Sequence, residues 1–107
     1  LTPKTVEQNS PLFPHPADMP RLAITMGVGT ILEAERCVML VTGSSKARVL
    51  AKAVEGPVTS MISATALQLH ANCTVVVDES AGDLLEQKEY YRWVFENDPQ
   101  WAAYRNV

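Results

Sequence analysis

Two unbroken apolar runs dominate the pattern of hydrophobic and polar positions along the chain. They cover residues 37–42 and 73–77, and β-branched side chains are frequent in both. Runs of this kind are typical of strands that are covered on both faces, as in a parallel sheet. A shorter apolar stretch at residues 22–25 predicts a third, short and buried strand.

The segment after the first long run predicts an amphipathic helix that begins at Ser44 or Ser45 and ends at Glu55. Its apolar positions recur at helical spacing and form one stripe. The glycine and proline that follow Glu55 are a usual helix stop. The stripe consists of Val49, Leu50, Ala53 and Val54.

Capping signals predict four further helices. A Ser, Thr or Asp side chain can cap the first free N–H groups of a helix, and an acidic residue three positions later strengthens the signal. The signals and the helices that they predict are Thr30 with Glu33 for residues 30–36, Ser63 for 63–70, Ser80 with Asp83 for 80–96, and Asp98 before a proline for 99–104.

The alternation of predicted strands and helices indicates an α/β fold with parallel strands and right-handed crossovers. Five of the seven prolines fall within residues 1–21, which predicts an extended arm. An α/β core over residues 22–87 and a helical tail over residues 88–107 are expected to follow. Three strands make a small parallel sheet, and the chain does not begin with Met. We therefore expect the 107 residues to be the carboxyl-terminal part of a larger domain.

Composition narrows the classes of function. The net charge of −3, without a basic patch, argues against nucleic acid as a partner. The apolar runs are too short to span a membrane, and no signal-peptide core opens the chain, so a cytoplasmic protein is expected. Cys37 and Cys73 are interpreted as buried, reduced thiols, and no cluster of cysteine and histidine indicates a metal site.

Side chains suited to anion binding gather at the start of the helix that ends at Glu55. Ser44, Ser45 and Lys46 lie there beside free backbone N–H groups, at the positive end of the helix dipole. Hydroxyl, amide and ammonium groups in this arrangement can hold a phosphate. A solvated surface lysine is the alternative, and the pattern alone leaves both open.

A second candidate for ligand contact is the turn that carries Gly27 and Gly29 before the predicted helix at residues 30–36. A strand, a Gly-x-Gly turn and a capped helix make a place where backbone can approach a ligand. The spacing lacks the third glycine of a dinucleotide site, so a tight structural turn is the alternative.

The other titratable side chains favour structural roles. His15 lies between two prolines, and His70 ends a predicted helix. Asp78 and Glu79 follow the last apolar run, at the edge where open α/β sheets bind ligands. Paired carboxylates can transfer protons, but such a pair more often begins a helix or lies in a solvated loop. The aromatic residues of segment 90–104 are interpreted as packing, with a subunit contact in a homo-oligomer as the alternative.

Five stretches of the chain, taken in order, resemble motifs of the glucosamine-6-phosphate deaminases. They fall within about residues 20–85, and together they are specific to that family. The stretches are residues 22–34, similar to ALTVGVGTLLDA; residues 41–47, similar to LVTGxxKA; residues 53–58, similar to AVEGxV; residues 63–70, similar to ISALQLH; and residues 76–79, similar to VCDE.

The resemblance implies a Rossmann-like three-layer α/β sandwich. It also implies conversion of an amino-sugar 6-phosphate, such as glucosamine 6-phosphate, to the ketose phosphate with release of ammonia and without a cofactor. Lys46 stands at the lysine of the GxxK motif, which binds the sugar phosphate in that family. The family's carboxylate base and ring-opening histidine lie upstream of the matching region, so no residue of this chain is assigned a catalytic role.

One departure from the family concerns phosphate binding. The family has a phosphate-binding arginine in an NSRFF-like segment, and this chain has Pro11 at that position. The identity of the sugar therefore stays open. Two other functions remain as alternatives, namely a hydrolase similar to 6-phosphogluconolactonase and a non-catalytic domain that senses sugar phosphates.

Overall fold

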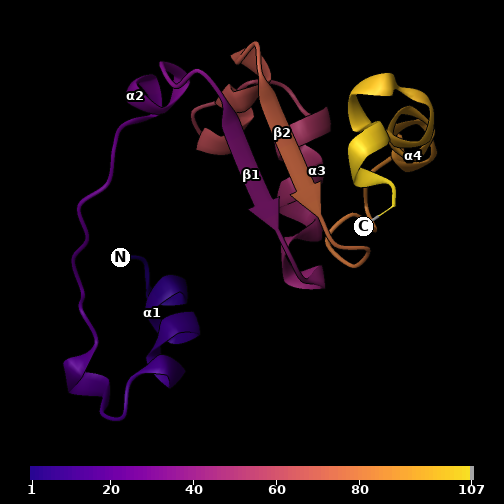
Figure 1. The fold of residues 1–107 in the computed structure, drawn as a ribbon. Coiled ribbons are helices and arrows are strands. Elements are labelled where there is room, and N and C mark those ends of the chain that lie inside the picture. The colour runs from indigo at the N-terminus through magenta and orange to yellow at the C-terminus, as the bar shows by residue number, and fades with distance from the viewer. Residues whose placement is uncertain (107) are drawn as a thin grey trace.

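The computed structural model describes residues 1–106 as an elongated arrangement in which an amino-terminal arm leads into a small α/β unit (Figure 1). The elements follow one another as helices, then a strand, a helical crossover, a second strand and two terminal helices. In order they are α1 (Pro3–Asn9), η1 (Ser10–Leu12), η2 (Pro16–Asp18), α2 (Val28–Leu32), β1 (Cys37–Val41), η3 (Ser44–Lys46), α3 (Ala47–Glu55), η4 (Ser63–Leu69), β2 (Cys73–Val77), α4 (Lys88–Asn97) and η5 (Pro99–Tyr104).

Strands β1 and β2 pair in parallel and in register, from Cys37 opposite Cys73 to Val41 opposite Val77. The two long apolar runs thus form the strands that the sequence predicts, and the parallel pairing is confirmed. Because the pairing is in register, the loops that follow Val41 and Val77 leave the same edge of the sheet side by side. This edge carries the polar residues of the candidate site.

Helix α3 covers one face of the two strands (Figure 1). Of the predicted stripe, Val49 is 43% exposed and Val54 is half-buried, so the buried face of the helix is narrower than predicted. Leu50 is only 2% exposed, and Ala47 and Ala53 are buried beside it. The opposite face is open in the described residues, where Val38 is 65% and Leu40 71% exposed. Alternate residues of a strand point to opposite faces, so this difference follows directly from the one-sided cover.

The crossover between the strands is held by polar contacts beneath α3. Thr65 of η4 is buried, and its hydroxyl contacts the backbone of Thr59 and Ile62. The side-chain amide of Gln68 donates to the carbonyls of Ala53 and Gly56 at the end of α3, at 2.8 Å each. These bonds satisfy two carbonyls that the end of α3 leaves free.

The third strand predicted at residues 22–25 does not form. This segment is extended but pairs with no other strand among residues 1–106, and Leu22 and Ile24 are almost fully exposed. A strand needs a hydrogen-bonding neighbour, and the sheet of the described residues consists of β1 and β2 alone. The apolar pattern therefore indicated an extended segment correctly and its burial wrongly.

Several helix starts differ from the capping signals. Helix α2 begins with Gly27 as N-cap, so Thr30 lies inside it and the Thr30–Glu33 capping box is absent. Helix η4 has Ile62 rather than Ser63 at its N-cap. In both cases no side chain caps the helix, because the first backbone bonds of the turn form one to three residues upstream of the predicted cap.

The helix predicted over residues 80–96 begins only at Lys88, because turns occupy residues 79–87. The predicted capping box of Ser80 and Asp83 does not form. Ser80 instead donates its hydroxyl to Asp78, which also accepts the N–H of Ala81. In contrast, Asp98 caps η5 through the N–H of Gln100, as the sequence predicts.

The arm is more folded than its prolines suggest. Residues 3–9 form a helix where an extended arm was expected, and the buried Met19 lies against Ser10 at its end. The backbone nitrogen of Leu1 donates to the carbonyl of Arg21 at 3.0 Å, which brings the two ends of the arm together. The boundaries at residues 21 and 87 stay predictions.

No helix among residues 1–106 is long and apolar enough to cross a membrane. Cys37 is buried as expected, whereas Cys73 is only partly buried, and both thiols are free. Cys73 lies in β2, which borders a cavity beside α4. This explains why the second cysteine keeps some exposure.

Candidate functional site

The loop after β1 brings the three predicted phosphate ligands into one turn. Gly43 has a φ of 87° and a ψ of 146°, a backbone conformation that only glycine adopts without strain. Its carbonyl accepts the N–H of Lys46 at 3.1 Å and so closes helix η3. The hydroxyls of Ser44 and Ser45 are exposed, and Lys46 is half-buried.

The Lys46 side chain borders a cavity of about 310 Å³ between the end of β1 and α3. Val41 and Thr42 line it from the strand, and Val49 lines it from the helix. Lys46 forms no ion pair within residues 1–106, where the salt bridges involve Lys88 and Arg92. An ammonium group without a protein carboxylate beside it is available to an anionic ligand.

Asp78, at the end of β2, anchors this turn from the neighbouring loop. Its two carboxylate oxygens accept the N–H of Gly43 at 3.2 and 3.0 Å. It also accepts the N–H of Ala81 at 2.7 Å and the hydroxyl of Ser80 at 3.1 Å. The N–H bonds from Ala81 and Gly43 hold the pKa of Asp78 below its ordinary value, and the Ser80 hydroxyl adds to the effect.

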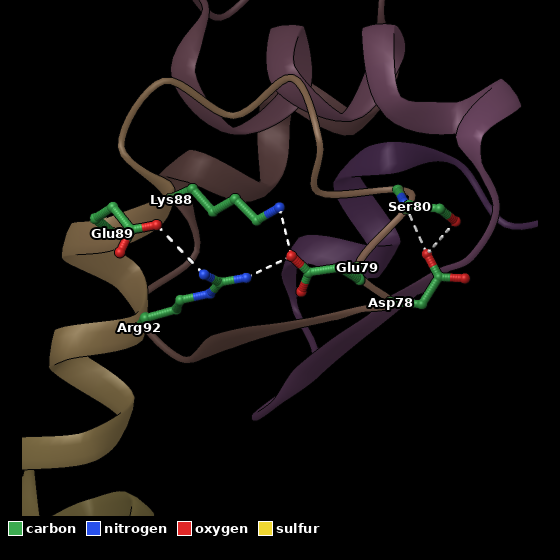
Figure 2. A network of polar contacts seen from close by, with 7 residues as sticks. Asp78, Glu79, Ser80, Lys88, Glu89 and Arg92 are labelled. Carbon is green, nitrogen blue, oxygen red and sulfur yellow. Dashed lines mark hydrogen bonds and ion pairs between the residues drawn. The ribbon is translucent and has the colours of Figure 1, made fainter.

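Glu79 turns away from this loop and contacts the start of α4 (Figure 2). It pairs with the ammonium of Lys88 at 2.7 Å and with the guanidinium of Arg92, which also reaches Glu89. The bonds from Lys88 and Arg92 lower the pKa of Glu79. Each of the two neighbouring carboxylates is thus engaged by donors, in a pattern that suits positioning rather than proton transfer.

Glu55, the last residue of α3, holds the beginning of α4. Its carboxylate accepts the N–H groups of Glu86 and Gln87 at 2.9 and 3.0 Å and the hydroxyl of Tyr91 at 3.0 Å. Burial raises the pKa of Glu55, but these bonds outweigh burial and the net pKa is lowered. A carboxylate at the amino end of a helix also suits the helix dipole.

Neither histidine lies in a catalytic arrangement. The two ring nitrogens of His70 are occupied by backbone, since Nδ1 accepts the N–H of Asn72 at 2.9 Å and Nε2 lies 2.6 Å from the carbonyl oxygen of Ala34. His15 is exposed in the arm. Within residues 1–106, no group of three or more His, Cys, Asp or Glu side chains is arranged to hold a metal ion.

The turn with Gly27 and Gly29 is not part of the Lys46 loop. It lies at the start of α2, near the amino end of β1, whereas η3 follows the carboxyl end (Figure 1). Both glycines are exposed, with open space where a side chain would point. The separation arises because residues 22–25 do not join the sheet, so this turn does not follow the carboxyl end of a strand.

A larger cavity of about 650 Å³ lies between β2 and the terminal helices. Val75, Tyr91 and Trp101 are among the residues that line it, and Lys46 is not. The cations at its border, Lys88 and Arg92, are already paired with Glu79. Despite its size, this cavity offers an anion less than the Lys46 turn does.

The link between Asp78 and Gly43 was not among the predicted features. One signal in the sequence could have revealed it. In-register parallel strands that end at Val41 and Val77 place the next residues, Thr42 and Asp78, opposite each other. A carboxylate there is within reach of the following backbone N–H, which belongs to Gly43.

Comparisons with known proteins identify relatives of the chain. The glucosamine-6-phosphate deaminase of Corynebacterium urealyticum is 45% identical over 104 residues, which are 97% of this chain and 40% of the relative. The enzyme of the same name from Hahella chejuensis is 46% identical over 94 residues, which are 88% of this chain and 36% of the relative. No family model matches the chain.

A solved structure gives the same result for the fold. It is described as a monomeric glucosamine-6-phosphate deaminase of the NagB superfamily, and it superposes with a TM-score of 0.73 at 38% identity. The superposition covers 78% of this chain and 35% of that structure, and the chain spans about 40% of the length of the curated relatives it matches. As its motifs predicted, the chain is homologous over nearly its whole length to the glucosamine-6-phosphate deaminases.

Proposed function

We propose that the protein is an amino-sugar-phosphate deaminase that acts on glucosamine 6-phosphate or a close variant, and that this chain supplies the phosphate-binding part. One observation carries the proposal. The turn of Ser44, Ser45 and Lys46 lies at the carboxyl edge of a parallel sheet, and its ammonium group has no carboxylate partner within residues 1–106. That edge is where open α/β sheets bind ligands.

Three kinds of donor converge on a phosphate in this proposal. Lys46 supplies a positive charge, Ser44 and Ser45 supply exposed hydroxyls, and the same two serines supply the first backbone N–H groups of helix η3. A dianionic phosphate suits the positive end of a helix and a lysine together. Pro11 offers no side-chain donor, so the arginine contact of the family is absent at that position.

The proposal includes a larger fold than the described residues form. Two parallel strands with α3 on one face leave Val38 and Leu40 exposed on the other. A parallel sheet is ordinarily covered on both faces, which supports a Rossmann-like three-layer sandwich in which another layer lies over these side chains. The proton-transfer steps belong to residues outside this chain, and none of its side chains is assigned to them.

The curated relatives reported above are named deaminases, which supports ammonia release over the alternative of lactone hydrolysis. A direct assay separates the two. The complete natural polypeptide that contains this chain should release ammonia from glucosamine 6-phosphate and should not open 6-phosphogluconolactone. Binding of the sugar phosphate without ammonia release would instead favour a sensing domain.

The role of Lys46 is tested by Lys46→Ala in the same complete polypeptide. Loss of a charge-assisted contact should raise the Kd for glucosamine 6-phosphate by about 10- to 100-fold. Lys52→Ala is the matched control, because Lys52 is an exposed lysine of α3, the helix that follows the turn. Equal affinity of the Lys46→Ala variant and the natural protein would refute the phosphate-binding role.

A further inference from the structure

We propose that Asp78 is a positioning residue for sugar-phosphate binding, which acts by fixing the backbone of the turn that presents Lys46. The inference rests on the proposed function, since it assumes that Lys46 binds the phosphate. It adds a residue from the loop after β2, 35 positions from Gly43 along the chain, to the residues that form the loop after β1.

The backbone conformation of Gly43 depends on the contacts that hold its N–H and carbonyl groups. Glycine has access to more backbone conformations than other residues, so contacts with its backbone groups select the φ of 87°. The contacts here are the two Asp78 oxygens on the Gly43 N–H, at 3.2 and 3.0 Å. Because Gly43 has no side chain, its neighbours can fix its conformation only through its backbone, and the bond from its N–H to Asp78 does so.

The bond between Gly43 and Asp78 is connected to Lys46 through the backbone of Gly43. The carbonyl of Gly43 accepts the N–H of Lys46 at 3.1 Å, which closes the helical turn η3. Asp78 therefore orients the N–H of Gly43, and the carbonyl of the same residue sets the start of the turn. A turn that is free to rotate about Gly43 would present the hydroxyls and the ammonium in many directions, and ordering them would cost binding free energy.

The Asp78 carboxylate is itself held in place by hydrogen bonds. The N–H of Ala81, whose side chain is fully buried, and the hydroxyl of Ser80 donate to the Oδ1 atom (Figure 2). These bonds fix the carboxylate on the loop after β2. Neighbouring Glu79 serves the start of α4 instead, through Lys88 and Arg92. The chain thus offers a matched control for charge at an adjacent position.

The test uses the complete natural polypeptide and glucosamine 6-phosphate as the ligand. Asp78→Ala should raise the KM and the Kd for this ligand about 10-fold and leave kcat nearly unchanged, because a binding interaction is weakened and no proton-transfer group is removed. Asp78→Asn should lie between, since an amide oxygen can still accept one N–H. Glu79→Gln should leave the Kd within about twofold.

A double-mutant cycle with Lys46→Ala separates positioning from an independent contact. If Asp78 acts through the Lys46 turn, adding Asp78→Ala to Lys46→Ala should weaken binding far less than the single change does. Additive effects would overturn the positioning role, as would a fall in kcat at unchanged KM. Full binding by Asp78→Ala together with weak binding by Lys46→Ala would overturn this inference and leave the proposed function standing.

Amide hydrogen exchange gives a second readout that needs no ligand. The Gly43 N–H should exchange at least 10-fold faster in Asp78→Ala than in the natural protein, whereas amides in α3 should keep their protection. Unchanged exchange at Gly43 would overturn the inference even if a variant binds poorly. Failure of the natural protein to bind glucosamine 6-phosphate would overturn both the function and the positioning role.

Discussion

Replacing Thr65 by valine tests how the buried crossover beneath α3 is stabilised. The side chain is 1% exposed, and its hydroxyl accepts the N–H of Thr59 at 2.8 Å. The same hydroxyl lies 3.0 Å from the carbonyl of Thr59 and 2.8 Å from that of Ile62, to which it can donate. Valine keeps the volume of the side chain and removes all of these bonds.

The loss of unfolding free energy depends on which groups lose their only hydrogen-bond partner. The carbonyls of Thr59 and Ile62 each keep a backbone donor, from Ile62 and Thr65 respectively. The N–H of Thr59 keeps none among the described contacts, and because this residue is only half-buried the loss should be about 1 kcal/mol, the lower end of the cost of an unpaired buried N–H. We therefore expect Thr65→Val to lower the free energy of unfolding by that amount.

Urea unfolding of the complete natural polypeptide measures this change as a lower midpoint at an unchanged m-value. Thr65→Ser is the control, because it keeps the hydroxyl and loses one methyl group, which costs about 0.8 kcal/mol in burial. A Thr65→Val protein within about 0.5 kcal/mol of the natural one would show that the hydroxyl bonds do not stabilise the crossover.

Further predictions concern the turn and the contacts at the start of α4. Gly43→Ala should destabilise the protein by about 1–3 kcal/mol in thermal unfolding, because alanine is strained at this φ. Gly29→Ala, in open space within α2, should be neutral or slightly stabilising. Burial and the Glu55 carboxylate raise the pKa of Tyr91 from 10.0 to about 12, so Tyr91→Phe should remove one phenol that ionises near pH 12 in an absorbance titration. The Tyr91 contribution to stability is complete below its ordinary pKa and is lost as the pH rises toward 12. The pKa of Glu55 is lowered, so its contribution is complete above its ordinary value of 4.5 and is lost as the pH falls further. Glu55→Gln should flatten this acid limb in urea midpoints measured across pH; an unchanged limb would contradict the assignment.

Local signals predicted the parts of the fold that depend on neighbours in sequence. The runs that begin at Cys37 and Cys73 form strands, and the stripe around Leu50 buries a helix face. Asp98 caps η5 because the cap and its N–H donor are two residues apart. The turn with Lys46 was likewise predicted from adjacent residues. The glycine before the turn directs the chain away from the strand.

Contacts between distant residues could not be read in the same way. Residues 22–25 have a strand-like pattern, but a strand also needs a partner that no local pattern supplies. The helix predicted from residue 80 begins at Lys88, since Asp78 binds the N–H of Ala81 and Glu55 binds those of residues 86 and 87. Glu55 is more than 30 positions from both of those N–H groups, so only the folded arrangement reveals the cap.

The bond between Gly43 and Asp78 has a consequence for the order of folding. It joins residues 35 positions apart, so it forms only after β2 has docked in parallel beside β1. Contacts of such sequence separation form late, because the intervening chain must first be ordered. An intermediate that has α3 but not the strand pair would therefore carry Ser44, Ser45 and Lys46 without their geometry. On the proposed function, affinity for phosphate should emerge during refolding together with the sheet, and later than helical structure.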